Sequence, residues 1–179
     1  MSIKKNLLLI FGVGDAYCSK DSNRFLKAGE KILAETAKLV QDKGNTFAGY
    51  INALEFGDID HPKTNIFDGV ESTKIIDLKL LNDTPLDDDN IIYLPTHDKD
   101  NMLFSADNFS FLFPSDKYNL FICGVDIKGC FVNLIDSLIV EGYNITVYSN
   151  IIKPFNKDTI TYIIEKSQSR NNKLRFCKS

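Results

Sequence analysis

The sequence predicts an α/β protein built on an open parallel sheet of about six strands, with helices on both faces. Two observations carry this prediction. Short apolar runs typical of buried strands alternate with segments of helical periodicity. The first run, NLLLIFGV at 6–13, is continuously apolar, as a strand covered on both faces must be. The connections are long enough for helical crossovers, which join parallel strands.

The amino-terminal part of the chain reads as two strands joined by a helix. After the first strand, apolar residues recur at helical spacing from about Asn23, with Ser22 as the predicted N-cap and Gly44 as the stop. A second strand lies within 45–56. The glycine- and proline-containing stretch 57–74 is expected to be an irregular loop.

The carboxyl-terminal part continues the alternation. A third strand is expected at 91–95, where Pro95 stops it, and a fourth at 118–125. A helix follows the fourth strand and ends at Gly142, and its predicted inner face consists of Phe131, Leu134, Ile135, Leu138 and Ile139. A fifth strand at 144–150, a helix around 157–167 and a short sixth strand at 173–177 complete the series.

Length and composition indicate one globular domain, which we assign to residues 1–179. Hydrophobic residues make up 44% and charged residues 25% of the 179 positions, both typical of a folded chain. The formal charge of −3 argues against a nucleic-acid partner. No apolar run is long enough for a membrane span, so no membrane partner is expected.

The cysteines and histidines give no metal or cofactor signature. Four cysteines are scattered without CxxC pairs, which favours reduced thiols and a cytoplasmic location. The stretch FGVGDAYC lacks the third glycine of a dinucleotide loop, so we expect a tight turn and no bound cofactor. His97, beside Asp98 and Asp100, is read as part of a solvated turn, with a metal or acid/base role as the alternative.

Cys130 is the candidate nucleophile. It follows Gly129 where the fourth strand gives way to a helix, so its sulfur is expected to meet the first-turn N–H groups and the positive end of the helix dipole. Both lower a thiol pKa, and the same N–H groups suit an oxyanion. The alternative is a buried structural cysteine. A further alternative is thiol redox chemistry with Cys18 or Cys123.

The stretch GVDIKGCFVNLIDSLIVEGYNITVYSN at 124–150 resembles the isochorismatase-like cysteine hydrolase superfamily. Members carry a GVxxxxC segment, a helix, an xGY turn and a VTV-like strand. The matching positions here are Gly124, Val125, Cys130, Gly142, Tyr143 and Val147. FSADNF, from 104, is similar to the element that follows the catalytic lysine of the family. The resemblance implies the strand order 3-2-1-4-5-6.

The same resemblance implies a catalytic triad that this chain does not keep. In the family a cysteine attacks the substrate carbon, an aspartate after the first strand accepts the proton, and a lysine after the third strand assists. Gly12 stands at the aspartate position, and the lysine position falls on Leu94, Pro95 or Asn101. Metal-binding histidines of the nicotinamidase kind are missing, unless Asp58, Asp60 and His61 replace them.

The sequence therefore favours a protein with a degenerate triad that acts by binding a small molecule in a cleft near Cys130. The alternative is an active cysteine hydrolase of a small amide, carbamoyl or ester substrate, with a rebuilt site of Cys130, Asp15 and Lys99. The resemblance also implies a homo-oligomer. The phenylalanine-rich segment 102–113 is a candidate interface, with burial in the core as the alternative.

Overall fold

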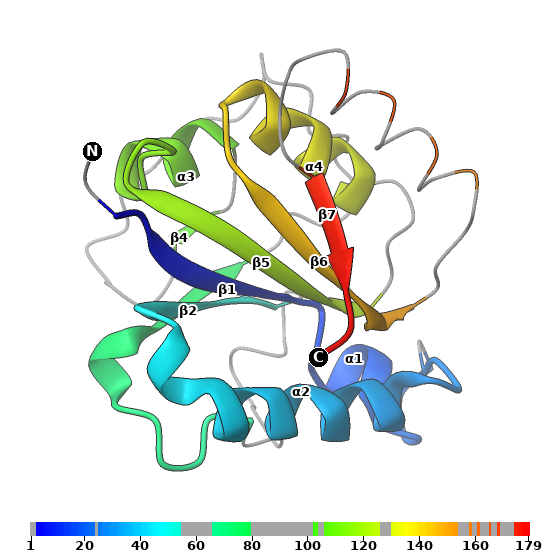
Figure 1. Ribbon diagram of the computed structural model, residues 1–179. Helices are drawn as coiled ribbons and strands as arrows, with labels where there is room; N and C mark the ends of the chain where they lie inside the picture. The colour runs from blue at the N-terminus through cyan, green and yellow to red at the C-terminus, as the bar shows by residue number, and fades with distance from the viewer. Residues whose placement is uncertain are drawn as a thin grey trace.

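The computed structural model describes most of the chain. The described residues are 3–23, 25–54, 66–79, 102–103, 106–125, 130–153, 158, 161, 165, 168 and 174–179. The predicted strand at 91–95 lies outside them, as do Lys99 and both histidines. Figure 1 shows a central sheet with α1 and α2 on one side and α3 and α4 on the other.

The first half of the chain forms two central strands and the helix between them. Its elements are β1 (Lys5–Phe11), α1 (Asp15–Cys18), α2 (Gly29–Lys43), the 3₁₀ turn η1 (Gly44–Thr46) and β2 (Gly49–Leu54). The prediction of a helix from Asn23 is wrong at its start, because α2 begins at Gly29. Ser22 is not its N-cap, since the Ser22 hydroxyl donates to the Ala16 carbonyl at 2.7 Å. The stop at Gly44 is confirmed.

The second half supplies the remaining strands and, among the elements whose bounds are described, the helices α3 and α4. These are η2 (Ser72–Lys74), β3 (Ile75–Lys79), β4 (Met102–Leu103), α3 (Ala106–Leu112), β5 (Tyr118–Val125), α4 (Cys130–Val140), β6 (Ile145–Lys153) and β7 (Leu174–Cys177). The fourth, fifth and sixth predicted strands correspond to β5, β6 and β7. The strand β3 was not predicted, because the sequence analysis placed the third strand at 91–95.

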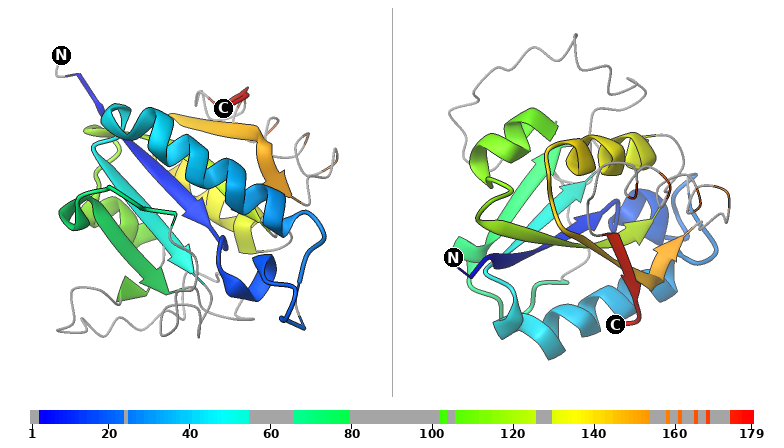
Figure 2. Two further views of the ribbon diagram at one scale, coloured as in Figure 1. Left: turned by 90° about the horizontal axis from the view of Figure 1, so that it is seen from below. Right: turned by 45° about the horizontal axis from the view of Figure 1, so that its top comes forward.

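All seven strands lie in one sheet, in the order β4-β3-β2-β1-β5-β6-β7. Every pairing is parallel. Without the two-residue β4, this is the predicted order 3-2-1-4-5-6. The predicted fold class is confirmed, with helices on both faces (Figures 1 and 2).

The core has two layers, one on each side of the sheet. On one side, β1 and β5 pack against α4, whose Ile135, Leu138 and Ile139 are buried as predicted. On the other side, Leu8 and Ile10 pack against Ile32, Leu39 and Val40 of α2. Figure 2 shows α2 lying across this second face. No helix among the described residues is long and apolar enough to cross a membrane.

The central strands β1 and β5 approach closely at their carboxyl ends. Gly124 pairs with Phe11 and has φ of +141°, a conformation that L side chains rarely adopt. A Cβ at residue 124 would lie 2.0 Å from the Phe11 carbonyl oxygen. Only glycine fits this position.

We therefore predict that Gly124→Ala lowers the free energy of unfolding by about 3 kcal/mol or more, through backbone strain and overlap. Urea denaturation followed by circular dichroism measures the change. Gly44→Ala is the matched control, because φ there is −52° and a Cβ would lie 3.5 Å from its nearest neighbour, the Tyr50 hydroxyl. Equal stability of the two variants would contradict the close approach of β1 and β5.

Candidate functional site

The candidate site lies at the carboxyl edge of the sheet, where β1 and β5 end side by side. The register pairs Phe11 with Gly124, so the segments that leave the two strands start next to each other. The segment after β1 leads into α1, and the segment after β5 leads into α4. In an open parallel sheet this edge is where ligands bind, because helix N-termini and loops meet there.

Cys130 is the first residue of α4, as the sequence predicted. The structure describes its backbone, while its side chain and residues 126–129 lie outside the described part. The helix that it opens has 11 residues, and the N–H groups of its first turn have no partner within the helix. A side chain at this position starts from the positive end of the helix dipole.

Gly12, at the position expected to hold the proton acceptor, has little room for a side chain. Its φ is +63°, in the left-handed region that favours glycine. Its N–H donates to the Ala53 carbonyl at 2.8 Å, which fixes the backbone. A Cβ there would lie 3.2 Å from the Val125 carbonyl oxygen and 3.4 Å from the Tyr17 ring. An aspartate would therefore be strained as well as crowded.

Asp15 is the first residue of the short helix α1 and is half-buried. Tyr17 and Cys18 hold α1 in the core below the sheet edge. The Tyr17 carbonyl accepts a hydrogen bond from the Leu26 N–H at 2.9 Å, and a Cβ at Gly29 would lie 2.2 Å from the same oxygen. The start of α2 therefore fixes α1, and with it the backbone of Asp15.

The structure brings two of the three predicted catalytic residues to the same sheet edge. Asp15 follows β1 and Cys130 follows the neighbouring β5, but no contact between their side chains is described. Lys99 lies outside the described residues, as do the alternative metal ligands Asp58, Asp60 and His61. Within the described part of the chain, no group of three or more His, Cys, Asp or Glu side chains is arranged to hold a metal ion.

The sequence analysis did not single out Gly29 or the crowding at Gly124. The signal for Gly29 was a glycine inside the segment of helical periodicity, where it is unfavourable compared with Ala or Glu. The signal for Gly124 was the change from an apolar run to glycine within ICGV. In both cases the glycine is explained by a tertiary contact that local patterns do not contain.

The other cysteines are poor nucleophiles. Burial raises the pKa of the Cys123 thiol to about 12, and the nearby Thr36 side chain opposes this shift only in part. Cys18 is 3% exposed. Burial also raises the pKa of Cys177, against the opposing charge of Lys43. Cys123, one of the suggested redox partners, is fully buried in the core.

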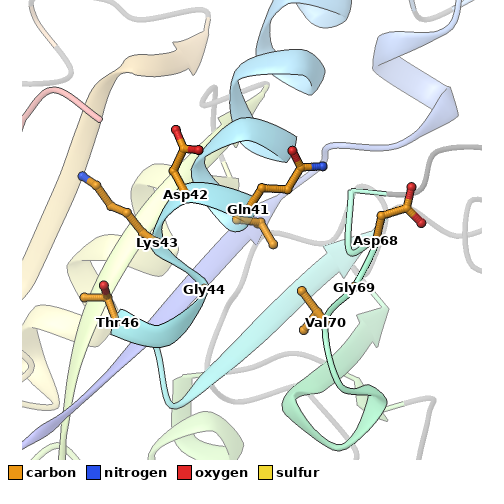
Figure 3. Close-up of a pocket in the computed structure, with 9 residues that line it drawn as sticks. Gln41, Asp42, Lys43, Gly44, Thr46, Asp68, Gly69 and Val70 are labelled. Atoms are coloured by element: carbon orange, nitrogen blue, oxygen red, sulfur yellow. The ribbon is translucent and has the colours of Figure 1, made fainter.

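A hollow of about 320 Å³ lies away from this edge, at the carboxyl end of α2. It is lined by the last turn of α2, by Gly44 and Thr46, and by the turn at 68–70. Figure 3 shows the Lys43 and Asp68 side chains pointing away from each other. The charged groups around this hollow therefore do not converge on one ligand position.

The fold and the site define a class of protein. It is an open parallel α/β fold in which the helix after the central strand β5 begins with a cysteine. Comparison with solved structures places it more closely. The nicotinamidase SaPncA of Staphylococcus aureus superposes with a TM-score of 0.58 at 14% identity, over 96% of this chain and 99% of that one. An isochorismatase-like hydrolase of Alkaliphilus metalliredigens gives a TM-score of 0.51 at 13% identity, over 98% and 95%.

The MAR1 ribonuclease of Caenorhabditis elegans is also similar, with a TM-score of 0.60 at 11% identity, over 98% of this chain and 80% of that one. No protein-family model and no curated protein sequence matches the chain. The chain therefore has the isochorismatase-like fold, as the sequence predicted. At these identities, the likeness establishes the fold alone.

We predict that Cys130 is the most reactive of the four thiols, because the other three are buried or have raised pKa values. Limiting iodoacetamide at neutral pH, followed by peptide mass spectrometry, measures the order of labelling in the native protein. Labelling in urea is the control, because it gives the order in which the four cysteines react in the unfolded protein. Faster native labelling of Cys177 than of Cys130 would contradict the prediction.

Proposed function

We propose that this chain is an isochorismatase-like protein that lacks the standard hydrolase activity of the superfamily and acts by binding a small molecule beside Cys130. The observation that carries the proposal is the geometry of Gly12. The isochorismatase-like superfamily, which this chain resembles, has a proton-accepting aspartate where this chain has Gly12. The backbone at position 12 disfavours any side chain. Loss of a positioned proton acceptor typically costs roughly 10²–10⁴-fold in rate.

The helix that starts at Cys130 supports the binding part of the proposal. Its first-turn N–H groups, which have no partner within the helix, suit a carbonyl or carboxylate oxygen, whether or not a reaction follows. Nicotinamide is the natural first probe, because the similar S. aureus protein is named a nicotinamidase. A thermal shift with nicotinamide that Cys130→Phe removes would support binding at this place.

The alternative function is an active cysteine hydrolase with a rebuilt site of Cys130, Asp15 and Lys99. One observation favours it: the backbones of Asp15 and Cys130 open the helices that follow neighbouring strands. In this reading Asp15 replaces the missing acceptor from three positions further along the chain. Lys99 would supply the positive charge.

We predict that the protein releases no more ammonia from nicotinamide or an N-carbamoyl amide than Cys130→Ala does. Gly12→Asp should not restore release, and it should lower the melting temperature, because the new side chain meets Val125. A coupled ammonia assay measures the first quantity and calorimetry the second.

Ammonia release well above that of Cys130→Ala would contradict the proposal and support the rebuilt site. In that case Asp15→Asn and Lys99→Ala should each abolish the release. Asp21→Asn is the matched control for Asp15, because it changes an exposed carboxylate just beyond α1.

The protein is also proposed to form a homodimer through α3 and the end of α4. Phe111 is 85% exposed, and Leu112 and Val140 are 39% and 51% exposed. Exposed apolar side chains of this size are a liability in a monomer. Phe109, the other phenylalanine considered for the interface, is 2% exposed and packs against Phe113 and Tyr143, so it belongs to the core.

We predict that Phe111→Asp converts the dimer to a monomer without unfolding it, because a charge then replaces an apolar contact. Sedimentation velocity at micromolar concentration measures the mass against 20.2 kDa for one chain. Phe111→Leu keeps an apolar side chain and should stay dimeric. A wild-type protein that sediments as a monomer would refute the dimer.

A further inference from the structure

A second hollow lies at the amino ends of β5, β6 and β7, on the side of the sheet that faces α2. Its volume is about 250 Å³, and it is lined by Asn119, Phe121, Asn144, Thr146 and Arg175. Six residues of extended strand, roughly 20 Å, separate Asn119 from Val125 at the other edge of the sheet. The hollow is therefore separate from the candidate site at Cys130. None of its residues carries a role in the proposed function.

The strand register places the lining side chains in two adjacent rows. Phe121 pairs with Thr146, and Thr146 pairs with Arg175, so these three side chains lie side by side across three strands. Asn119 and Asn144 lie two residues before Phe121 and Thr146. Side chains two residues apart in a strand point to the same face. The floor of the hollow is thus built on hydrogen-bonded strands of the sheet.

A chain of side-chain amides fixes one of the two rows. The Asn144 amide donates from Nδ2 to Asn119 Oδ1 at 3.0 Å, and Asn119 Nδ2 donates to Asn6 Oδ1 at 3.2 Å. Each of these donating amide groups has a second N–H. The Phe121 ring is held by edge contacts with Phe47, at 5.4 Å between ring centroids. The polar and apolar walls are therefore both held in place.

Among the described residues that line the hollow, Arg175 is the only charged one. Its side chain has no ion pair or hydrogen bond with the described residues, and neither has the Thr146 hydroxyl. A guanidinium group has donors and no acceptor, and the second amide N–H groups add further donors. The lining consequently offers positive charge and N–H donors. It is complementary to a ligand with negative charge and acceptor oxygens.

We propose that this hollow binds a small molecule that carries a carboxylate or phosphate group, with the anionic group on Arg175 and the amides. The planar guanidinium matches both anions in a bidentate geometry. The Phe121 ring provides an apolar wall for the remainder of the ligand. The volume is below the usual range for drug-sized ligands, so the ligand is small. Because the hollow is remote from Cys130, its ligand does not occupy the place proposed for a small molecule there.

The test uses the full chain and two probes, sodium benzoate and inorganic phosphate, each titrated at constant ionic strength. Two-dimensional NMR of the ¹⁵N-labelled protein follows the side-chain amide signals of Asn119 and Asn144. We expect a saturable shift of both signals with at least one probe. The probe that saturates identifies the anionic group.

Arg175→Gln should weaken binding of that probe at least tenfold, while its melting temperature stays unchanged because the side chain is exposed. Lys178→Gln is the matched control, since it removes the same charge from an exposed residue nearby, and it should leave binding within twofold of the wild type. Shifts that stay linear with both probes would overturn the proposal. It would also be overturned if Arg175→Gln bound as well as the wild type, or if Lys178→Gln lost as much affinity as Arg175→Gln.

Discussion

The arrangement of the candidate site depends on one close contact, between the backbones of β1 and β5 at Gly124 and Phe11. The Phe11 carbonyl occupies the space that a Cβ of residue 124 would need. This contact brings the carboxyl ends of the two central strands together and sets where their chains leave the sheet. Gly12 follows Phe11 directly and lies against Val125. A glycine therefore lies at the carboxyl end of each strand, Gly12 after β1 and Gly124 in β5. The same packing that joins the strands leaves little space for a side chain at position 12.

Gly12 is therefore part of the packing of this fold, and its position does not readily accept an aspartate. At position 12 the backbone has φ of +63° and lies beside the Val125 carbonyl oxygen, so any L residue placed there would be strained. The glycine at position 12 and the path of the chain after β1 are thus coupled.

The sequence predicted the sheet and the helix at Cys130 because their signals are local. The strand β5 is a largely apolar run with Gly124 as its penultimate residue, and α4 has helical periodicity followed by Gly142, whose φ is +85°. The strand β3 was missed, because Asp77 and Lys79 break the apolar run of IIDLK, while 91–95 has a longer one. The start of α2 was missed because Gly29 is set by its contact with the Tyr17 carbonyl. How Asp15, Cys130 and Lys99 lie relative to one another depends on the path of the loops, which no local pattern encodes.

The two edges of the sheet differ because α2 is fixed at both of its ends. Its first residue, Gly29, lies against the Tyr17 carbonyl, and the Gly44 carbonyl that follows it accepts a hydrogen bond from the Tyr50 hydroxyl at 3.1 Å. Its 15 residues span roughly 22 Å, so α2 covers about this length of the sheet face that carries Leu8 and Ile10. Residues under α2 are apolar, such as Leu8 and Ile10, whereas the amide row of Asn119 and Asn144 lies at the amino ends of the strands. If α2 were longer, it would cover the amide row. Apolar side chains would then be favoured there, because burying amide groups without full hydrogen bonding is costly. The polar hollow at the amino edge thus follows from the same helix that fixes α1 at the carboxyl edge.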